Sequence, residues 1–320
     1  MEKKEKKLVF ILPYFGTFPS YFSLFLKSCE YNPEVDWLIY TDNRTGYSYP
    51  KNVIVRYITL EEIRERIEKS IGFSISLHRA YKLCDFKPIY GDIFQDDIKE
   101  YQYWGHCDCD LIFGDIKKFV FPLLEQKYHK LFFLGHCTLY QNNIENNTLY
   151  RKTKRYKTVF TTSNSLHFDE EFQDSINTIF LANKRRIYLE HLEANIDAMK
   201  SYFYTVKYDF KKSKYVAQKE TESLFLFDHG KIIKYNQNFS KEIISKEYLY
   251  IHLQERNMKM EIDTEEYYKI IPNMFQSLEV SSITKENFKS IHKGNFNMQY
   301  FLIRWKRLKQ KLGRMVGFHR

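Results

Sequence analysis

The sequence predicts an α/β fold, in which helices flank a mainly parallel sheet and a helical appendage follows at the C-terminal end. Two observations support this prediction. Short apolar runs alternate along the chain with stretches of helical periodicity, and parallel strands require such helical crossovers. In addition, 43% of the 320 residues are hydrophobic, with 27 Phe and 26 Tyr among them, which is enough to build a sizeable core.

The first part of the chain carries the clearest elements. Strands are predicted at 8–12, 37–41 and 53–55, and helices at 21–28 and 60–69. Pro13 and Gly16 end the first strand, and Asp42 follows the second. Ligands of parallel sheets bind beyond the carboxyl ends of the strands, so Pro13, Tyr14 and Asp42 are predicted to contact the ligand.

The next elements surround an acidic motif. A helix over 79–86 stops at Pro88, and an aromatic run over 101–104 leads into Asp108-Cys109-Asp110. A strand at 131–134 follows this motif. Beyond it the pattern is weaker, and the predicted elements are a helix at 187–199 and strands at 224–227 and 248–253.

The chain shows neither an internal repeat nor a clear linker. We therefore expect a catalytic domain over 1–258, an extension over 259–296 and a basic amphipathic helix over 297–320. In the last segment, apolar residues recur at helical spacing, namely Phe301, Trp305, Leu308, Leu312 and Met315. The cations between them are Arg304, Lys306, Arg307, Lys309, Lys311 and Arg314. The stripe either packs on the catalytic domain or lies in the interface of an anionic membrane.

The net charge indicates the class of binding partner, and the cysteine content indicates the cellular compartment. The net charge of +10 implies an anionic partner, such as nucleic acid, an acidic membrane or a phosphorylated substrate. Nucleic acid is not expected, because the chain has no RNA-recognition or helix-turn-helix signature. An odd number of cysteines, five, without framework spacing agrees with a reducing compartment. We therefore expect a cytoplasmic protein that is peripheral at the inner face of the plasma membrane.

Asp108 and Asp110 are the residues on which a site prediction rests. In an extended chain, residues two apart point to the same side. Two carboxylates on one side form an oxygen-rich pocket for Mn²⁺ or Mg²⁺, and the cation would in turn bridge a diphosphate that the bare carboxylates repel. Paired Asp residues also cap turns, so the spacing alone leaves both interpretations open.

Two segments carry a resemblance to a known family. They are 80–91, AYKLCDFKPIYG, and 103–115, YWGHCDCDLIFGD. Together they resemble glycosyltransferases of the GT-A type, and more narrowly bacterial ones that build capsules and other surface polysaccharides. Fainter similarity extends through 135–140 and 167–170 to 248–256. The resemblance implies a GT-A-like, Rossmann-like fold, a nucleotide-sugar donor that is UDP-linked by default, and Mn²⁺ or Mg²⁺.

The resemblance also implies roles for single residues. In the enzymes that the chain resembles, an Asp and a basic residue of the helix contact the donor, and Asp85 and Lys87 stand at those places. Lys87 departs from the Arg that is common in related families, and a Lys makes no bidentate contact with phosphate. A late histidine completes the metal site in many of these enzymes, and His252 is the candidate here. Taken alone, it would be a hydrogen-bonded core residue.

Glycosyl transfer also needs groups that handle charge and protons. The cation, Lys87 and Arg256 are predicted to stabilise the departing nucleoside diphosphate. An inverting enzyme needs a carboxylate that accepts the proton of the acceptor hydroxyl, and Asp169 and Glu170 are the candidates. A retaining enzyme needs no such base, and the alternative for these two acids is a solvated turn or helix start.

The predicted function is metal-dependent transfer of a sugar from a nucleotide-diphosphate donor to a surface glycan or a lipid-linked acceptor. Two alternatives stay open: a metal-dependent nucleotidyltransferase or phosphatase, which also uses paired Asp residues, and a non-catalytic protein that binds an anionic ligand. Gly-rich phosphate loops, G-x-S-x-G and H-E-x-x-H are absent, which argues against P-loop enzymes, hydrolases of the nucleophile-elbow type and zinc proteases.

Overall fold

The chain folds into two compact units in the computed structural model. The described residues are 6–170, 172–197, 203–218, 223–238, 240–254, 256–292, 298, 301–302, 304–305 and 308–309. Unit 1 comprises 1–18, 29–109 and 116–191, and unit 2 comprises 19–28, 110–115 and 192–320. Strands between 194 and 252 pair with other strands of unit 2, and the expected boundary at 258–259 stays a prediction.

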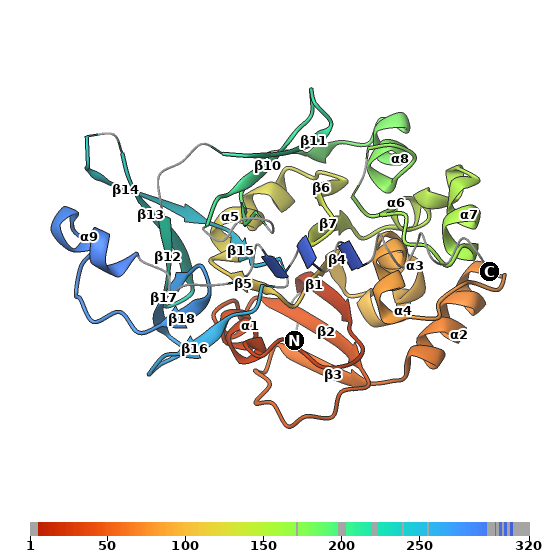
Figure 1. The fold of residues 1–320 in the computed structure, drawn as a ribbon. Helices are drawn as coiled ribbons and strands as arrows, with labels where there is room; N and C mark the ends of the chain where they lie inside the picture. Colours follow the sequence, from red (N-terminus) through yellow and green to blue (C-terminus); the bar gives the residue numbers. More distant parts are fainter. Residues whose placement is uncertain are drawn as a thin grey trace, which may run out of the picture. The chain divides into compact units, whose positions relative to one another are not determined.

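Within the described residues, a seven-stranded sheet forms the centre of unit 1, in the order β3-β2-β1-β4-β7-β6-β8 (Figure 1). The strands are β1 (Lys6–Pro13), β2 (Val35–Thr41), β3 (Val53–Tyr57), β4 (Tyr101–Cys107), β6 (Lys130–Leu134), β7 (Cys137–Gln141) and β8 (Ile187–Tyr188). β1 is parallel to β2 and β4, and β2 is parallel to β3. β7, however, is antiparallel to both β4 and β6.

The sheet is therefore mixed: the pairs within β3-β2-β1-β4 and the pair β6-β8 are parallel, as predicted, and among these strands β7 runs antiparallel to both of its neighbours. The reason lies in the connection between β6 and β7. Only Gly135 and His136 separate the two strands, and a two-residue link can join only antiparallel neighbours.

Helices of unit 1 cover the sheet. They are α2 (Leu60–Ile71), η1 (Ala80–Ile89), α3 (Tyr90–Ile93), α4 (Gln95–Ile98), α5 (Ile116–Glu125), α6 (Ile144–Asn147), η2 (Leu149–Lys152), α7 (Arg155–Thr161) and α8 (Ile176–Ala182). A capping box between Thr59 and Glu62 starts α2, and Gly72 ends it in the left-handed conformation. Ile63 and Ile67 of α2 share one buried core with Val9 and Ile11 of β1.

Unit 2 is built mainly from strands. One sheet has the order β5-β15-β9, a second β14-β13-β12-β17-β18-β16, and a third pairs β10 with β11. The strands are β5 (Leu111–Phe113), β9 (Ala194–Asn195), β10 (Val206–Asp209), β11 (Lys214–Ala217), β12 (Ser223–Asp228), β13 (Lys231–Gln237), β14 (Ile243–Tyr248), β15 (Tyr250–His252), β16 (Lys259–Glu261), β17 (Tyr267–Ile271) and β18 (Met274–Gln276). The helices are α1 (Phe22–Glu30), most of which belongs to unit 2, and α9 (Lys285–Ile291).

Two predictions about the second half of the chain have opposite outcomes. The strands expected at 224–227 and 248–253 are confirmed as β12 and as the end of β14 with β15. The helix expected at 187–199 is wrong, because β8 and β9 occupy this stretch. Ala194 and Asn195 pair instead with Ile251 and His252 of β15, a contact between segments far apart in the sequence.

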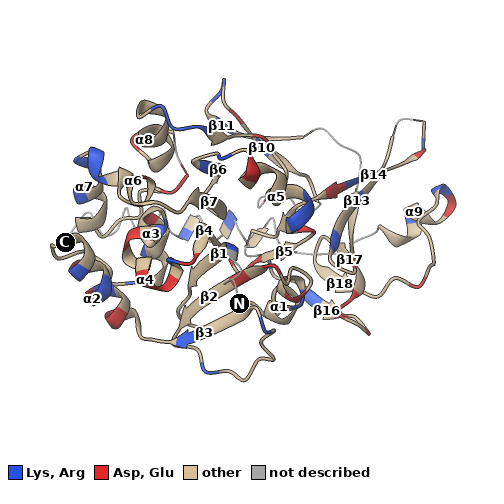
Figure 2. Ribbon diagram, turned by 180° about the vertical axis from the view of Figure 1, so that it is seen from behind, with Lys and Arg blue, Asp and Glu red and all other residues tan. Residues whose placement is uncertain are grey.

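Charge is unevenly distributed along the chain. The stretch 151–157, which reaches into α7, contains five Lys and Arg residues and stands out in Figure 2. Of the predicted basic helix over 297–320, residues 301–302, 304–305 and 308–309 are helical, and Leu312, Met315, Lys306, Arg307, Lys311 and Arg314 lie outside the described residues. No helix among the described residues is long and apolar enough to cross a membrane.

Candidate metal and donor site

The segment Asp108-Cys109-Asp110 links β4, which ends at Cys107, to β5, which begins at Leu111. Hydrogen bonds of the backbone fix both ends of the segment. The amide of Asp108 donates to the carbonyl of His136 (2.9 Å), and the carbonyl of Asp110 accepts from the amide of Leu253 (3.1 Å). The positions of both carboxylates are therefore set by the strands that carry them.

Asp110 and His252 face each other in a buried environment. His252 Nε2 lies 3.4 Å from Asp110 Oδ2, and the two side chains are only 7% and 9% exposed. On the other side of the ring, His252 Nδ1 is 3.0 Å from Asn195 Oδ1, which also accepts from Gln254 Nε2 (2.7 Å). Because an amide oxygen only accepts, Nδ1 is the donor of this bond, and Nε2 is the ring nitrogen that faces the carboxylate of Asp110. A proton or a metal cation is what can lie between Nε2 and the carboxylate oxygen.

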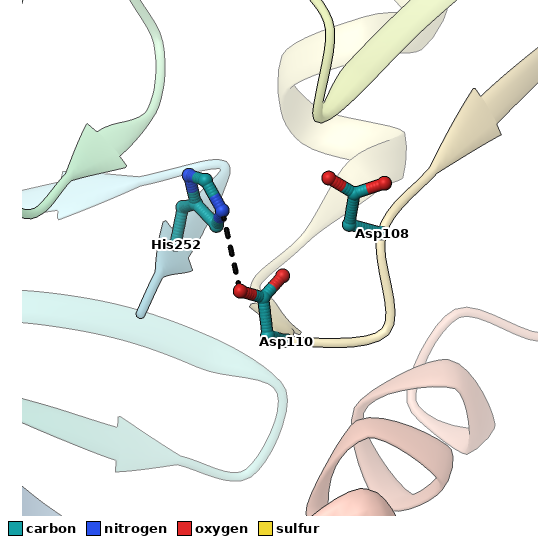
Figure 3. A group of neighbouring side chains, drawn as sticks. All are labelled: Asp108, Asp110 and His252. Atoms are coloured by element: carbon teal, nitrogen blue, oxygen red, sulfur yellow. Dashed lines mark ion pairs between the residues drawn. The ribbon is translucent and has the colours of Figure 1, made fainter. Parts of the chain in front are cut away.

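Asp108 completes a group that could hold a metal ion. One ligand atom each from Asp108, Asp110 and His252 lies within 4.8 Å of the others (Figure 3). The structure thus brings together the three residues that were expected to be metal ligands. Two carboxylates and an imidazole form a donor set that suits a divalent cation, and the bond of Asn195 to the far ring nitrogen is the support that metal-bound histidines usually have.

Lys87 of η1 lies beside this motif in unit 1. Its Nζ donates to Asp108 Oδ1 (2.6 Å) and to the carbonyl of Gly135 (2.8 Å), and Asp169 Oδ2 is 3.7 Å away. Burial lowers the pKa of Lys87, but the charges of Asp108 and Asp169 outweigh burial and hold this pKa well above its usual value. Lys87 therefore remains a fixed positive charge next to the acids.

Asp169 is the most deeply buried acid of this cluster. Burial raises the pKa of its carboxyl to about 7, against the opposing charge of Lys87. Its Oδ1 is buried and accepts no hydrogen bond from the described residues. Its Oδ2 packs on Gly135, where a Cβ atom would come within 2.4 Å. Position 135 therefore requires glycine, a constraint that sequence reasoning missed, although the residue directly follows a predicted strand.

Glu170 is more accessible and differently held. Its Oε2 accepts from the amide of Gly135 (3.3 Å), and its Oε1 is 3.4 Å from His167 Nδ1. Burial raises the pKa of Glu170, but the hydrogen bond and charge of His167 outweigh burial and lower this pKa below its usual value. His167 has a left-handed backbone, with φ of 51°. The two predicted base candidates thus differ, since only Asp169 is held toward its protonated form.

Asp85 supports the segment that carries Asp169. Both of its oxygens accept backbone amides, from Leu166 (2.9 Å to Oδ2) and Phe168 (2.9 Å to Oδ1), while Lys82 Nζ donates to Oδ2 (2.7 Å). The side chains of Lys82 and Asp85 are almost fully buried. The structure therefore gives Asp85 a positioning role, and its contact with the donor stays a prediction. Lys82 was missed, although its spacing of three residues from Asp85 could have indicated the pair.

The residues predicted after β1 and β2 lie close to one another. The amide of Gly16 donates to Asp42 Oδ1 (2.8 Å), and the amide of Tyr14 donates to the carbonyl of Tyr40 (2.8 Å). Ile11 of β1 pairs with His106 of β4, two residues before Pro13 and Asp108 respectively. Pro13, Tyr14, Asp42 and Asp108 therefore share the carboxyl edge of the parallel strands, where ligands bind in such sheets.

Arg256 is held inside unit 2. Its guanidinium donates to the carbonyls of Pro272 (3.1 Å) and Asp197 (3.1 Å) and lies 5.4 Å from the ring centroid of Phe203. Burial lowers the pKa of Arg256 to about 10. These contacts account for its burial, and the role expected at the leaving group stays a prediction.

Comparisons with known proteins give a family of sequences and weak likenesses to solved structures. No curated protein matches the chain. The apo form of mouse xyloside xylosyltransferase 1 is similar with a TM-score of 0.33 and 10% identity over 60% of this chain and 87% of that chain, values too low to carry an argument. The profile of a family described as of unknown function, DUF6625, matches residues 10–279. The chain therefore belongs to the DUF6625 family.

Proposed function

We propose that this protein is a metal-dependent glycosyltransferase that uses a nucleotide-diphosphate sugar, UDP-linked by default, and a glycan or lipid-linked acceptor. One observation carries the proposal. His252 Nε2 and a carboxylate oxygen of Asp110 face each other at 3.4 Å, and Asp108 offers a further oxygen within reach. A divalent cation is what such an arrangement of acceptors binds.

Mn²⁺ or Mg²⁺ is the proposed ion, and Asp108, Asp110 and His252 would hold it. Carboxylates suit both ions, and the imidazole favours Mn²⁺ over Mg²⁺. The bound ion would supply a positive charge for the diphosphate of the donor. Asp110 and His252 are buried and held by backbone hydrogen bonds, whereas the side chain of Asp108 is 37% exposed and would meet the donor.

Lys87 would provide a second positive charge, besides the metal ion, that stabilises the departing nucleoside diphosphate. Its ammonium has three N–H donors, of which the bonds to Asp108 and Gly135 use two. A phosphate oxygen that enters here would meet a fixed charge in a partly buried setting, where electrostatic interactions are stronger than in water. Pro13, Tyr14 and Asp42, at the same edge of the sheet, would contact other parts of the donor.

Asp169 would act as the base of an inverting reaction. Its buried Oδ1, which accepts no hydrogen bond from the described residues, is an acceptor available to a substrate hydroxyl. Because its pKa is raised to about 7, this carboxylate is more basic than an ordinary Asp and still ionised at neutral to alkaline pH. Glu170, whose pKa is lowered, is the weaker base of the two.

The test is an assay of donor turnover with a panel of nucleotide sugars, in Mn²⁺, in Mg²⁺ and after removal of metal by chelation. We expect release of nucleoside diphosphate only with metal, and loss of release in Asp108→Asn and Asp110→Asn. Asp96→Asn, at an exposed position of α4, is the matched control and should keep full activity. Turnover that survives chelation and both substitutions would overturn the proposal, and so would cleavage between the phosphates, which identifies a nucleotidyltransferase or phosphatase.

A further inference from the structure

The described residues near the C-terminal end present an unusual surface. Five large apolar side chains there are each between 47% and 58% exposed, namely Met298, Phe301, Leu302, Trp305 and Leu308. Together with Arg304 they line one shallow apolar surface, to which no other described residue contributes. Most other large apolar residues with comparable exposure are scattered singly over the chain, such as Tyr81, Ile144 and Phe210. Contiguous apolar exposure of this kind is typical of an interaction site.

The exposure of these side chains supports the membrane interpretation of the amphipathic segment. A stripe that packed on the catalytic domain would be buried like Ile63 and Ile67 of α2, which are 1% and 0% exposed. Residues 301–302, 304–305 and 308–309 are helical, and the amide of Leu302 donates to the carbonyl of Met298 (2.9 Å). The described residues between 301 and 309 are therefore helical, while their apolar side chains remain largely accessible.

The charge of the segment identifies the class of partner. Residues 297–320 contain seven Lys and Arg residues and no Asp or Glu. Lys309 Nζ lies 5.4 Å from the ring centroid of Trp305, so at least one cation borders the apolar surface directly. Long basic side chains beside an aromatic surface can place their stems in an apolar phase and their charges at its polar boundary.

We infer that the surface formed by Met298, Phe301, Leu302, Trp305 and Leu308 binds an anionic lipid bilayer, with these apolar side chains in the acyl boundary and Arg304 and Lys309 among the headgroups. A second copy of the chain is a poorer partner, because the segments would bring together like charges with no acid to pair them. Nucleic acid would satisfy the cations, but a phosphate backbone leaves Phe301, Leu302 and Leu308 in water. Only an anionic bilayer satisfies both features. The inference is independent of the proposed transfer reaction.

The experiment uses the intrinsic fluorescence of the full-length protein. Of the three Trp residues, Trp37 and Trp104 are fully buried and Trp305 is 58% exposed, so a shift of emission on binding reports on the segment. Vesicles of phosphatidylcholine alone are compared with vesicles of equal parts phosphatidylcholine and phosphatidylglycerol. We expect a blue shift and co-sedimentation only with the anionic vesicles, weakened by high salt.

Variants separate the contributions of the two features. Phe301→Ser and the double variant Arg304→Gln/Lys309→Gln should each weaken vesicle binding by at least about tenfold, since one removes apolar insertion and the other charge attraction. Ile144→Ser, at a position of α6 that is 66% exposed, is the matched control and should bind like the parent. Sedimentation and emission are measured on the same samples, and circular dichroism checks that each variant is folded.

Several outcomes would overturn the inference. Absence of binding by the parent protein, equal binding to both kinds of vesicle, or equal loss of binding in Ile144→Ser would each do so. Concentration-dependent dimers that Phe301→Ser dissolves, without vesicle binding, would assign the surface to a second copy. Binding of a single-stranded oligonucleotide without binding of vesicles would assign it to nucleic acid. Donor turnover with a soluble acceptor is measured in parallel, so that a failure here is distinguishable from a failure of the proposed reaction.

Discussion

Lys87 Nζ lies 2.6 Å from Asp108 Oδ1, so a fixed positive charge already neutralises the more exposed acid of the predicted metal motif. The same Lys87 is the predicted contact of the donor diphosphate. Lys87 therefore competes with the cation for Asp108 and cooperates with it at the donor. The first role weakens metal binding, whereas the second strengthens donor turnover. A single substitution of Lys87 therefore distinguishes them.

We expect Lys87→Met to leave the binding of Mn²⁺ to the free protein unchanged or tighter, because a competing charge is lost. Turnover of the donor should nevertheless fall by roughly 10²–10³-fold, the cost typical of losing one electrostatic contact to a developing charge. Metal affinity is measured by electron paramagnetic resonance of Mn²⁺, and turnover by release of nucleoside diphosphate. Weaker metal binding that parallels the loss of turnover would show that Lys87 only supports the fold of the motif.

The bond between His252 and Asn195 gives a prediction about metal affinity. Asn195→Ala removes the acceptor of the Nδ1 proton, so the ring loses its fixed tautomer and orientation. We expect the affinity for Mn²⁺ to fall by about 10–100-fold, as for other partners of metal-bound histidines. Asn238→Ala, at an exposed turn before β14, is the control. Unaltered Mn²⁺ titration of Asn195→Ala by calorimetry would argue against His252 as a ligand.

Gly135 gives a prediction about stability. A Cβ atom at this position would lie 2.4 Å from Asp169 Oδ2, so Gly135→Ala must displace a buried carboxylate. We expect the free energy of unfolding to fall by about 1–3 kcal/mol, as for other overpacked sites, and donor turnover to fall with it. Gly46→Ala is the matched control, because a Cβ there meets nothing within 4 Å. Urea unfolding of both variants decides, and equal midpoints would contradict the close contact.

The raised pKa of Asp169 predicts how activity depends on pH. A base acts in its ionised form, so with a pKa of about 7 transfer should rise as the pH increases through 7. The charged groups that shift the pKa of Asp169, and so set the pH at which activity rises, are Lys87, Glu170, His167 and Asp108. The same shift makes the folded state bind more protons than the unfolded state between pH 4 and pH 7. Asp169 therefore contributes stability at low pH that is lost as the pH rises through this window.

Profiles of the logarithm of turnover against pH check this assignment. Asp169→Asn should abolish the limb near pH 7 together with most of the activity. Glu170→Gln should retain the limb, since the pKa of Glu170 is lowered rather than raised. A limb that persists in Asp169→Asn but disappears in Glu170→Gln would exchange the two roles.

The elements that the sequence predicts well are those with a local signal. β1, β2 and α2 follow from apolar runs, from helical periodicity and from breakers such as Pro13. The antiparallel course of β7 and the strand β9 were missed, because strand pairing is decided by partners far along the chain. Fewer strands were predicted for unit 2 than the structure contains. Its strands are short, and in many of them polar residues alternate with apolar ones.

The candidate site shows a similar division. Asp108 and Asp110 stand out by spacing, and the resemblance to GT-A enzymes led to His252, which lies beside Asp110 in the structure. The role of Asp85 was not predictable, because its partners Leu166 and Phe168 are 81 and 83 residues away. A local motif gives the type of chemistry that a residue can perform, whereas its hydrogen-bond partners decide whether it meets a ligand or holds a segment in place.

The short connection between β6 and β7 restricts how this site can vary in evolution. The amide of Gly135 donates to Glu170, its carbonyl accepts from Lys87, and the carbonyl of His136 accepts from Asp108. All three contacts use backbone atoms, so they depend on the length and path of the turn and not on the identity of the side chain at position 136. One inserted or deleted residue would displace all three at once. Homologues should therefore tolerate replacement of His136 far more readily than any change in the length of this turn.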